Sequence, residues 1–206
     1  MSLYESLKRL NTLVVPSAAS EEVDLLRLIN YRMFMRCVNN EDRCVILSLI
    51  ARGVTSANDI ANVLGTSRTG IYRHLNILEK SGMIVHKDGR FYIAAKMFLV
   101  YDVEMDNDGY IRVNIHPDKG GFVDEGTGLV LVKGENCKCN VCKNLDLCTR
   151  AVKNLAKKLD VKIRSENPLN AFSEIVKGII YRDVLGIINN GYLIVKPVYE
   201  MHKDEG

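Results

Sequence analysis

Residues 66–84 read TSRTGIYRHLNILEKSGMI, and this stretch decides how the first half of the chain folds. Ile71, Leu75 and Leu78 recur at the spacing of one face of an α-helix. A Thr-Ser pair just before the helix can cap its start, and a Ser-Gly pair just after it can end it. The stretch therefore predicts an amphipathic helix over residues 67–80.

The remaining faces of this predicted helix carry hydroxyl, phenol, amide and guanidinium groups, concentrated in its N-terminal half. Such groups hydrogen-bond to base edges and to phosphates. The helix is therefore a candidate for insertion into a DNA groove. Its candidate contact residues are Ser67, Arg68, Thr69, Tyr72, Arg73 and Asn76.

The segments on either side complete a recognisable order of elements. Residues 42–52 and 56–64 each have apolar residues at helical spacing, and a glycine follows each of them. After residue 82, two β-rich runs, 83–86 and 90–93, flank Lys87-Asp88-Gly89. An Asp-Gly between two such runs is a strong hairpin signal. The sequence thus predicts three helices and a hairpin over residues 41–93, with Lys87 and Arg90 near the hairpin tip.

This order resembles the winged helix-turn-helix regulators of the ArsR and MarR type, and residues 66–84 carry most of the resemblance. They are similar to the ArsR-type recognition helix, in which a Ser/Thr-rich start leads to Arg-His-Leu and then to an apolar exit after glycine. Met83 stands where Leu or Ile is usual, and it keeps that position apolar. The resemblance implies that the recognition helix and the hairpin, or wing, contact DNA, through Ser67, Arg68, Thr69, Tyr72, Arg73, Lys87 and Arg90. It says nothing about the other three quarters of the chain.

An alternative is a winged helix that docks onto proteins, as in a subunit of the transcription machinery or of another assembly. A docking helix would more often expose apolar side chains. The polar face with its arginines therefore favours DNA.

Charge is distributed unevenly along the 206 residues, although the net charge is only +3. Residues 41–96 carry 8 basic and 5 acidic side chains, and residues 137–164 carry 8 and 2. Residues 97–136 instead carry 3 basic and 8 acidic side chains. The two basic segments suit a phosphate-rich partner, and the acidic one between them does not.

Several classes of protein are not indicated. No stretch is long and apolar enough to span a membrane, and no signal segment opens the chain, so we expect a cytoplasmic protein. The usual phosphate-binding, dinucleotide-binding, zinc-protease and serine-hydrolase motifs do not occur, so we do not expect an enzyme.

The N-terminal 40 residues predict a weak helix over 3–13 and a stronger one over 20–38. The stronger helix either forms a dimerisation arm or covers the winged-helix core. We accordingly divide the chain into a helical arm (1–40), a winged helix (41–96) and a C-terminal α+β domain (97–206). The fold class expected for the whole is α+β.

The C-terminal domain should begin with antiparallel strands over residues 97–133, with turns at 106–109 and 117–121. An amphipathic helix is expected over 145–160, and a markedly apolar one over 169–188, followed by a strand over 192–199. So apolar a helix must be buried on most sides, either within the chain or against a second copy. With the 20–38 helix it is our candidate interface for a homodimer.

Four cysteines fall within twelve residues in the pattern C-x-C-x2-C-x5-C, namely Cys137, Cys139, Cys142 and Cys148. Several thiols close together can converge on one metal ion, and Lys138 and Lys143 are expected to favour the thiolate forms. The spacing matches neither a zinc ribbon nor a ferredoxin. Zinc, an iron–sulfur cluster, and free thiols or disulfides therefore remain open. Cys37 and Cys44 lie on apolar helix faces and are expected to be buried.

Together these features predict a DNA-binding transcriptional regulator, a homodimer, whose C-terminal cysteines bind metal or respond to redox state.

Overall fold

The structure is a computed structural model that describes residues 12–15, 24–105, 107–108, 110–184 and 194–195. Within these ranges, six strands form one sheet in the order β7-β6-β5-β2-β1-β8. β2 (Asp24–Asn30) and β5 (Ala95–Met105) run parallel at its centre, and the other neighbours are antiparallel. The remaining strands of this sheet are β1 (Thr12–Val15), β6 (Ile111–Asp124), β7 (Gly128–Lys133) and β8 (Ile194–Val195). A mixed α+β fold was expected, and it is observed.

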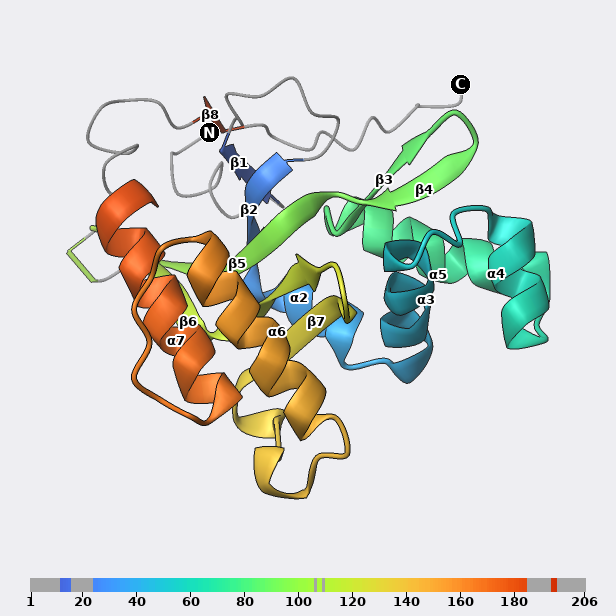
Figure 1. Ribbon diagram of the computed structural model, residues 1–206. Helices are drawn as coiled ribbons and strands as arrows, with labels where there is room; N and C mark the ends of the chain where they lie inside the picture. Colours follow the sequence, from blue (N-terminus) through green and yellow to red (C-terminus); the bar gives the residue numbers. More distant parts are fainter. Residues whose placement is uncertain (1–11, 16–23, 106, 109, 185–193, 196–206) are drawn as a thin grey trace.

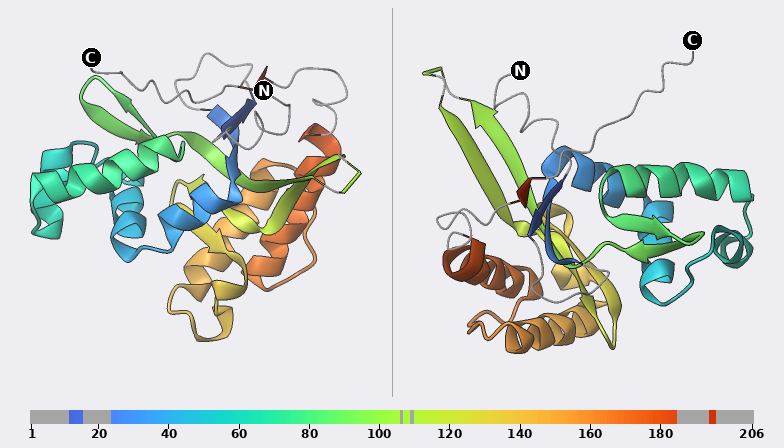
Figure 2. Two further views of the ribbon diagram at one scale, coloured as in Figure 1. Left: turned by 180° about the vertical axis from the view of Figure 1, so that it is seen from behind. Right: turned by 90° about the horizontal axis from the view of Figure 1, so that it is seen from above.

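Helices cover both faces of this sheet, so the chain has three layers (Figure 2). Leu99 and Tyr101 of β5 pack against α6 and α7, whereas Phe98 and Val100 on the opposite face pack against the winged helix. This alternation follows from the two-residue period of a strand. The sheet therefore joins two hydrophobic cores, one for each layer of helices.

The winged helix forms as predicted, from α3 (Glu41–Ala51), α4 (Ala57–Leu64), α5 (Arg68–Lys80) and the hairpin β3 (Ile84–Lys87) and β4 (Arg90–Ile93). Each helix has a side-chain cap, because the oxygens of Asn40, Ser56 and Ser67 accept hydrogen bonds from backbone N–H groups of the first turn. At the tip of the wing, Asp88 and Gly89 have φ values of 51° and 74°. Two positive φ angles in succession make the tight hairpin turn for which an Asp-Gly pair is suited. The wing projects away from the body of the molecule (Figure 1).

The helix predicted over residues 20–38 is wrong in its first half. The strand β2 covers Asp24–Asn30, and α2 (Tyr31–Val38) begins only after it, capped by Asn30. Leu28 of β2 faces one core and Ile29 faces the other. Apart from Arg27, the middle of β2 is apolar, and periodicity cannot tell so short and nearly continuous an apolar run from a helix. α2 itself packs on the winged-helix core through Phe34, so it covers that core.

The turn predicted at residues 117–121 is also absent, because β6 continues through it. The pairing of β6 with β5 shifts between Leu99, which pairs with Gly120, and Val100, which pairs with His116. The extra residues form a bulge in the strand. A Cβ at position 120 would collide with the Phe98 carbonyl and press on the ring of Phe172. This position requires glycine, and its apparent turn signal came from that close packing.

The C-terminal helices form close to their predicted places. α6 (Leu145–Lys158) matches the amphipathic prediction. α7 (Pro168–Ile179) continues as a short π-helix, η3 (Ile180–Val184), and residues 185–188 of the predicted helix lie outside the described residues. The apolar side chains of α7 are buried against the sheet of the same chain. The apolarity of this helix is therefore explained without a second subunit.

The two ends of the chain are described only in part. Residues 3–11 of the first predicted helix lie outside the described residues, and Thr12 and Leu13 belong to β1, so the prediction is wrong there. β8 lies within the predicted last strand, most of which is not described. In the described ranges, no helix combines the length and the apolar character needed to cross a membrane.

Candidate nucleic-acid interface and cysteine hollow

α5 buries Ile71, Leu75 and Leu78, each no more than 1% exposed, and thereby turns its polar side outward. The eight predicted DNA-contacting residues are all exposed. Six come from α5 and its cap, Ser67, Arg68, Thr69, Tyr72, Arg73 and Asn76, and two come from the wing, Lys87 and Arg90.

Arg68 and Tyr72, one helical turn apart, act as a unit on this exposed side. The Arg68 guanidinium donates a hydrogen bond of 3.2 Å to the Tyr72 hydroxyl and lies 5.4 Å from the centre of its ring. Stacking of this kind restricts both side chains while the guanidinium stays accessible. The pair therefore presents positive charge from a partly fixed position.

Phe91 connects the wing to this helix, a role that the sequence reading did not identify. Its ring meets Tyr72 edge to face at 6.3 Å and stacks on His86 of β3 at 4.4 Å. Its backbone N–H donates to the Thr55 carbonyl at 2.8 Å. Phe91 is 2% exposed. The alternation of exposed and inward positions along β4 is the sequence signal that could have identified Phe91 as a core residue, but that signal does not reveal its neighbours.

The end of α5 is tied to the central sheet through Ser81 and Gly82. The buried Ser81 hydroxyl donates to the Leu78 carbonyl at 2.7 Å and lies 3.0 Å from the Cys37 sulfur of α2. Arg27 of β2 donates to the Gly82 carbonyl at 2.8 Å. Burial raises the pKa of Cys37 above its ordinary value. Cys37 is thus the buried apolar residue that was predicted, and the helix end is held to β2 and α2.

His74 lies beside the buried side of α5 and faces inward, toward α3. Its Nε2 lies 4.0 Å from the Asp42 carboxylate of α3. Its Nδ1 is shielded from solvent and has no hydrogen-bond partner among the described residues. It is therefore turned from the exposed polar side toward α3.

The four clustered cysteines line one hollow of about 640 Å³ at the edge strand β7. Cys137 directly follows the short helix η1 (Gly134–Asn136), Cys139 begins the short helix η2 (Cys139–Val141), Cys142 directly follows η2, and Cys148 lies in the first turn of α6. Ser48 of α3 and Arg52, the residue that caps the end of α3, line the same hollow. The cysteines therefore share a cavity with the first helix of the winged helix.

The cysteines do not form a compact coordination group. Among the described residues, no three His, Cys, Asp or Glu side chains lie close enough together to hold a metal ion. The expectation that nearby lysines favour thiolate is wrong for two of them. Burial raises the pKa of Cys137, and burial together with the charges of Cys139, Cys137 and Cys142 raises that of Cys148 to about 11. All six cysteines are unpaired, Cys37 and Cys44 included.

Lys133 bridges the hollow and α3. Its backbone N–H donates to the Cys137 sulfur at 3.0 Å, and its ammonium donates to the Cys44 sulfur at 3.5 Å. Cys44 was expected to be buried, but it is only half-buried and packs against the outside of the winged-helix core. The contact with Cys44 could not be read from the sequence, because Cys44 and Lys133 are 89 residues apart.

Asp124 fixes the turn between β6 and β7, which forms one wall of the hollow. Its carboxylate accepts hydrogen bonds from the backbone N–H groups of Gly126 and Thr127 and from the Asn154 side chain of α6. Burial alone would raise the pKa of Asp124, but the hydrogen bonds from Asn154, Thr127 and Gly126 lower it below its ordinary value. The turn and α6 are therefore held together by a carboxylate that is charged at neutral pH.

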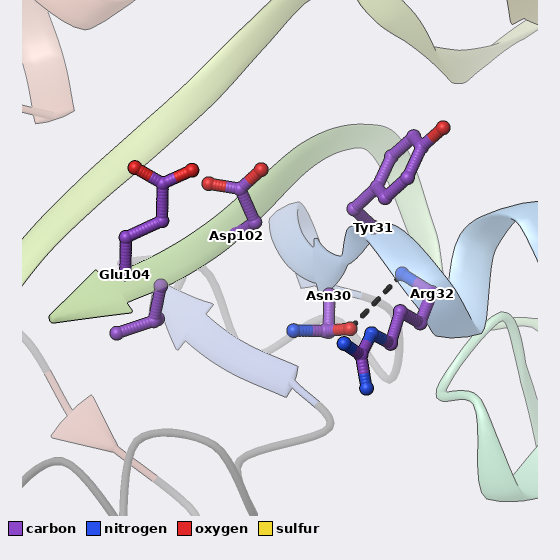
Figure 3. Close-up of a pocket in the computed structure, with 6 residues that line it drawn as sticks. Asn30, Tyr31, Arg32, Asp102 and Glu104 are labelled. Atoms are coloured by element: carbon purple, nitrogen blue, oxygen red, sulfur yellow. Dashed lines mark hydrogen bonds between the residues drawn. The ribbon is translucent and has the colours of Figure 1, made fainter.

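A second hollow, of about 410 Å³, lies where the parallel strands β2 and β5 end (Figure 3). Asp102 and Glu104 of β5 line one side of it, and Asn30 and Arg32 line the other. One Asp102 oxygen lies 2.9 Å from His116, whereas the other is shielded and has no hydrogen-bond partner in the part of the chain that is described.

The helix-turn-helix domain family matches residues 39–87. This range begins just before α3, includes α4 and α5, and ends with β3 of the wing. No curated protein matches the chain. The chain thus carries a helix-turn-helix domain, and this domain supports a DNA-binding regulator.

Proposed function

We propose that this protein is a winged-helix transcriptional regulator of the ArsR or MarR type that binds double-stranded DNA by inserting α5 into the major groove. The observation that carries the proposal is the exposure of all eight polar residues predicted for DNA contact on α5 and the wing. These two elements are joined through Tyr72 and Phe91, so they can approach one duplex together.

The candidate DNA-contacting residues fall into groups that suit either base edges or the phosphate backbone. Arg73 and Asn76 lie on the exposed side of α5, and their guanidinium and amide groups match the edges of guanine and adenine. Ser67 and Thr69 lie at the helix start, where hydroxyl and N–H groups suit phosphate. Lys87 and Arg90 at the wing tip suit the backbone or the minor groove.

We also propose that two copies bind together. One recognition helix reads only a half-site, and a two-fold dimer would place two helices in successive major grooves about 34 Å apart. The described side chains of α7 and α2 that were candidates for this interface pack mostly within their own chain. The dimer proposal therefore rests on the geometry of DNA reading.

The cysteines are proposed as the metal-binding or redox-responsive site of this regulator, with zinc as the first candidate and an iron–sulfur cluster as the alternative. Their position around a single hollow supports the proposal. Thiolates are suitable ligands for both. Elemental analysis and an absorbance spectrum of anaerobically purified protein separate the two, because an iron–sulfur protein is brown and bleaches in air.

Selection of bound duplexes from a random library tests the main proposal. We expect enrichment of an inverted repeat whose half-sites are centred about 10 base pairs apart. Arg73→Ala should relax the base preference at one position in each half-site. If no DNA sequence is enriched while the chain binds a protein partner, the winged helix docks onto proteins instead of DNA.

A further inference from the structure

β5 continues after its neighbour β2 has left the sheet. The last residue of β2, Asn30, pairs with Tyr101, and the chain then turns into α2. Along Asp102–Met105, β5 pairs only with β6 in the part of the chain that is described. Figure 2 shows these two strands extending from the body of the molecule as a ribbon. The β2 side of Asp102–Met105, which we call the open edge of β5, thus presents backbone N–H and C=O groups without a described strand partner over about 13 Å.

The hollow of about 410 Å³ lies along this open edge (Figure 3). Asp102, Val103 and Glu104 are consecutive, so their side chains alternate between the two faces of β5, and yet all three line the hollow. A hollow that reaches both faces of a strand must lie beside the edge of that strand. It therefore takes up the place that β2 would occupy if it continued past Asn30.

The outer side of β6 is a second edge of this ribbon, but it is protected against pairing. β7 covers β6 only from Lys119 onward. Next to that point, Pro117 has no N–H to donate, and Ser173 of α7 donates to its carbonyl at 3.1 Å. Prolines and bulges, both present in β6, are means by which proteins protect sheet edges. Asp102–Met105 contains neither, so the open edge of β5 can accept another strand.

The side chains beside the open edge indicate what an added strand should carry. Asp102 and Glu104 share one face of β5, and Figure 3 shows their carboxylates on the same side, with the Arg32 guanidinium extending away from them. Glu104 is exposed, and one Asp102 oxygen has no hydrogen-bond partner among the described residues. The other face carries Val103 and Met105, and Met105 is 50% exposed. Basic and apolar side chains in alternation would complement the two faces.

A second copy of this chain does not suit the open edge. If two open edges paired about a two-fold axis, Asp102 and Glu104 of one copy would lie against those of the other. Like charges directly opposite each other on two strands are destabilising. Residues 97–136, which include the open edge, carry 3 basic and 8 acidic side chains. Charge complementarity therefore favours a basic occupant.

We propose that the open edge of β5 is a docking site for an extended, basic segment of a partner protein, which adds to the sheet as a strand beside β5. Addition of a strand to a sheet edge is a general mode of peptide recognition, in which backbone hydrogen bonds give affinity and alternate side chains give specificity. Lys or Arg side chains of the segment pair with Asp102 and Glu104, and apolar ones between them pack on Val103 and Met105. The inference goes beyond the proposed DNA-binding function and does not depend on it.

Selection of displayed random peptides on the full chain, in the absence of DNA, tests the inference. Enriched peptides should carry Lys or Arg at alternate positions with apolar residues between them. Fluorescence anisotropy of a labelled enriched peptide then gives its dissociation constant. Glu104→Lys should weaken binding about three- to tenfold, because it replaces attraction by repulsion at an exposed position. Glu135→Lys is the matched control, since Glu135 is also exposed but lies in η1, outside the open edge, and it should leave binding unchanged.

Methylation of the peptide backbone separates strand addition from a contact made by charge alone. In an added strand, alternate N–H groups point toward β5 and the others point away. Methylation of the first set of nitrogens should weaken binding at least about fivefold, and methylation of the second set should be tolerated.

Four results would each overturn the inference: no enrichment, enriched peptides without alternating basic residues, unchanged binding to Glu104→Lys, or equal effects of the two methylations. A dimer of the chain that the peptide dissociates would also overturn it, because a second copy would then occupy the open edge. Absence of DNA binding would instead contradict the proposed function alone.

Discussion

Replacement of Phe91 should destabilise the wing and also loosen the contact between the wing and the recognition helix α5. Phe91 is 2% exposed and contacts the rings of Tyr72 and His86. Truncation of a buried Phe to Ala costs about 3–5 kcal/mol. Phe91→Leu keeps most of the side-chain volume, so it costs less stability than Phe91→Ala. The packing mismatch usually costs below about 1.5 kcal/mol, and each lost aromatic contact costs about 0.5–1.5 kcal/mol. We therefore expect about 2–3 kcal/mol for Phe91→Leu.

Phe122→Leu is the control for this change. Phe122 is fully buried in the other core and stacks on Phe172 at 5.8 Å, so its replacement should destabilise the chain to a similar degree. Urea denaturation gives the free energy of unfolding, and anisotropy in the absence of urea gives DNA affinity. In the absence of urea, where both variants are folded, Phe91→Leu should lower DNA affinity several-fold and Phe122→Leu should not. Equal DNA affinity in the two variants would refute the role of Phe91 in holding the wing to α5.

Three further predictions concern single features. Arg73→Ala should cost about 1–3 kcal/mol of binding to the selected site, with little loss on unrelated duplex, as measured by competition binding. The Lys87→Ala/Arg90→Ala variant should weaken binding to all sequences alike and should flatten the slope of log affinity against log salt by about 2. Burial raises the pKa of Tyr101 to about 12, while the unfolded chain loses the same proton near pH 10. The free energy of unfolding should therefore fall as pH rises from 10 to 12, by an amount on the order of 2–3 kcal/mol that Tyr101→Phe removes.

The winged helix could be predicted from the sequence because its signals are local. The caps at Asn40, Ser56 and Ser67, the Asp88-Gly89 turn and the apolar face of α5 each depend on residues a few positions apart. The exposure of the candidate DNA-contacting residues follows from the same periodicity. Local and tertiary preferences agree in this part of the chain.

The parts that could not be predicted depend on distant contacts. The sequence of β2 predicts a helix, because its pairing as a strand depends on β5, some seventy positions later. Gly120 suggested a turn, whereas its small size admits Phe172 from α7. The bridge from Lys133 to Cys44 joins two segments that share no local pattern.

The cysteine cluster lies between these cases. Its spacing identified the residues, and the structure places all four around one hollow. The positive charges of Lys138 and Lys143 suggested low pKa values for the cysteine thiols. The pKa values of Cys137 and Cys148 are instead raised, because burial dominates at both. The participation of α3 in the hollow followed only from the three-layer fold.

The salt dependence of DNA affinity tests the central claim most directly. Arg68, Arg73, Lys87 and Arg90 are exposed on α5 and the wing. If Arg68, Lys87 and Arg90 each neutralise one phosphate, log affinity should fall with log salt with a slope of about −2.7 per chain, and the variant with these three replaced by Ala should lose most of it. Lys153→Ala/Lys157→Ala removes exposed charge from α6, in the opposite layer of helices, and should leave the slope unchanged. A flat salt dependence of the parent, or a slope that depends on α6 and not on α5 and the wing, would contradict the account.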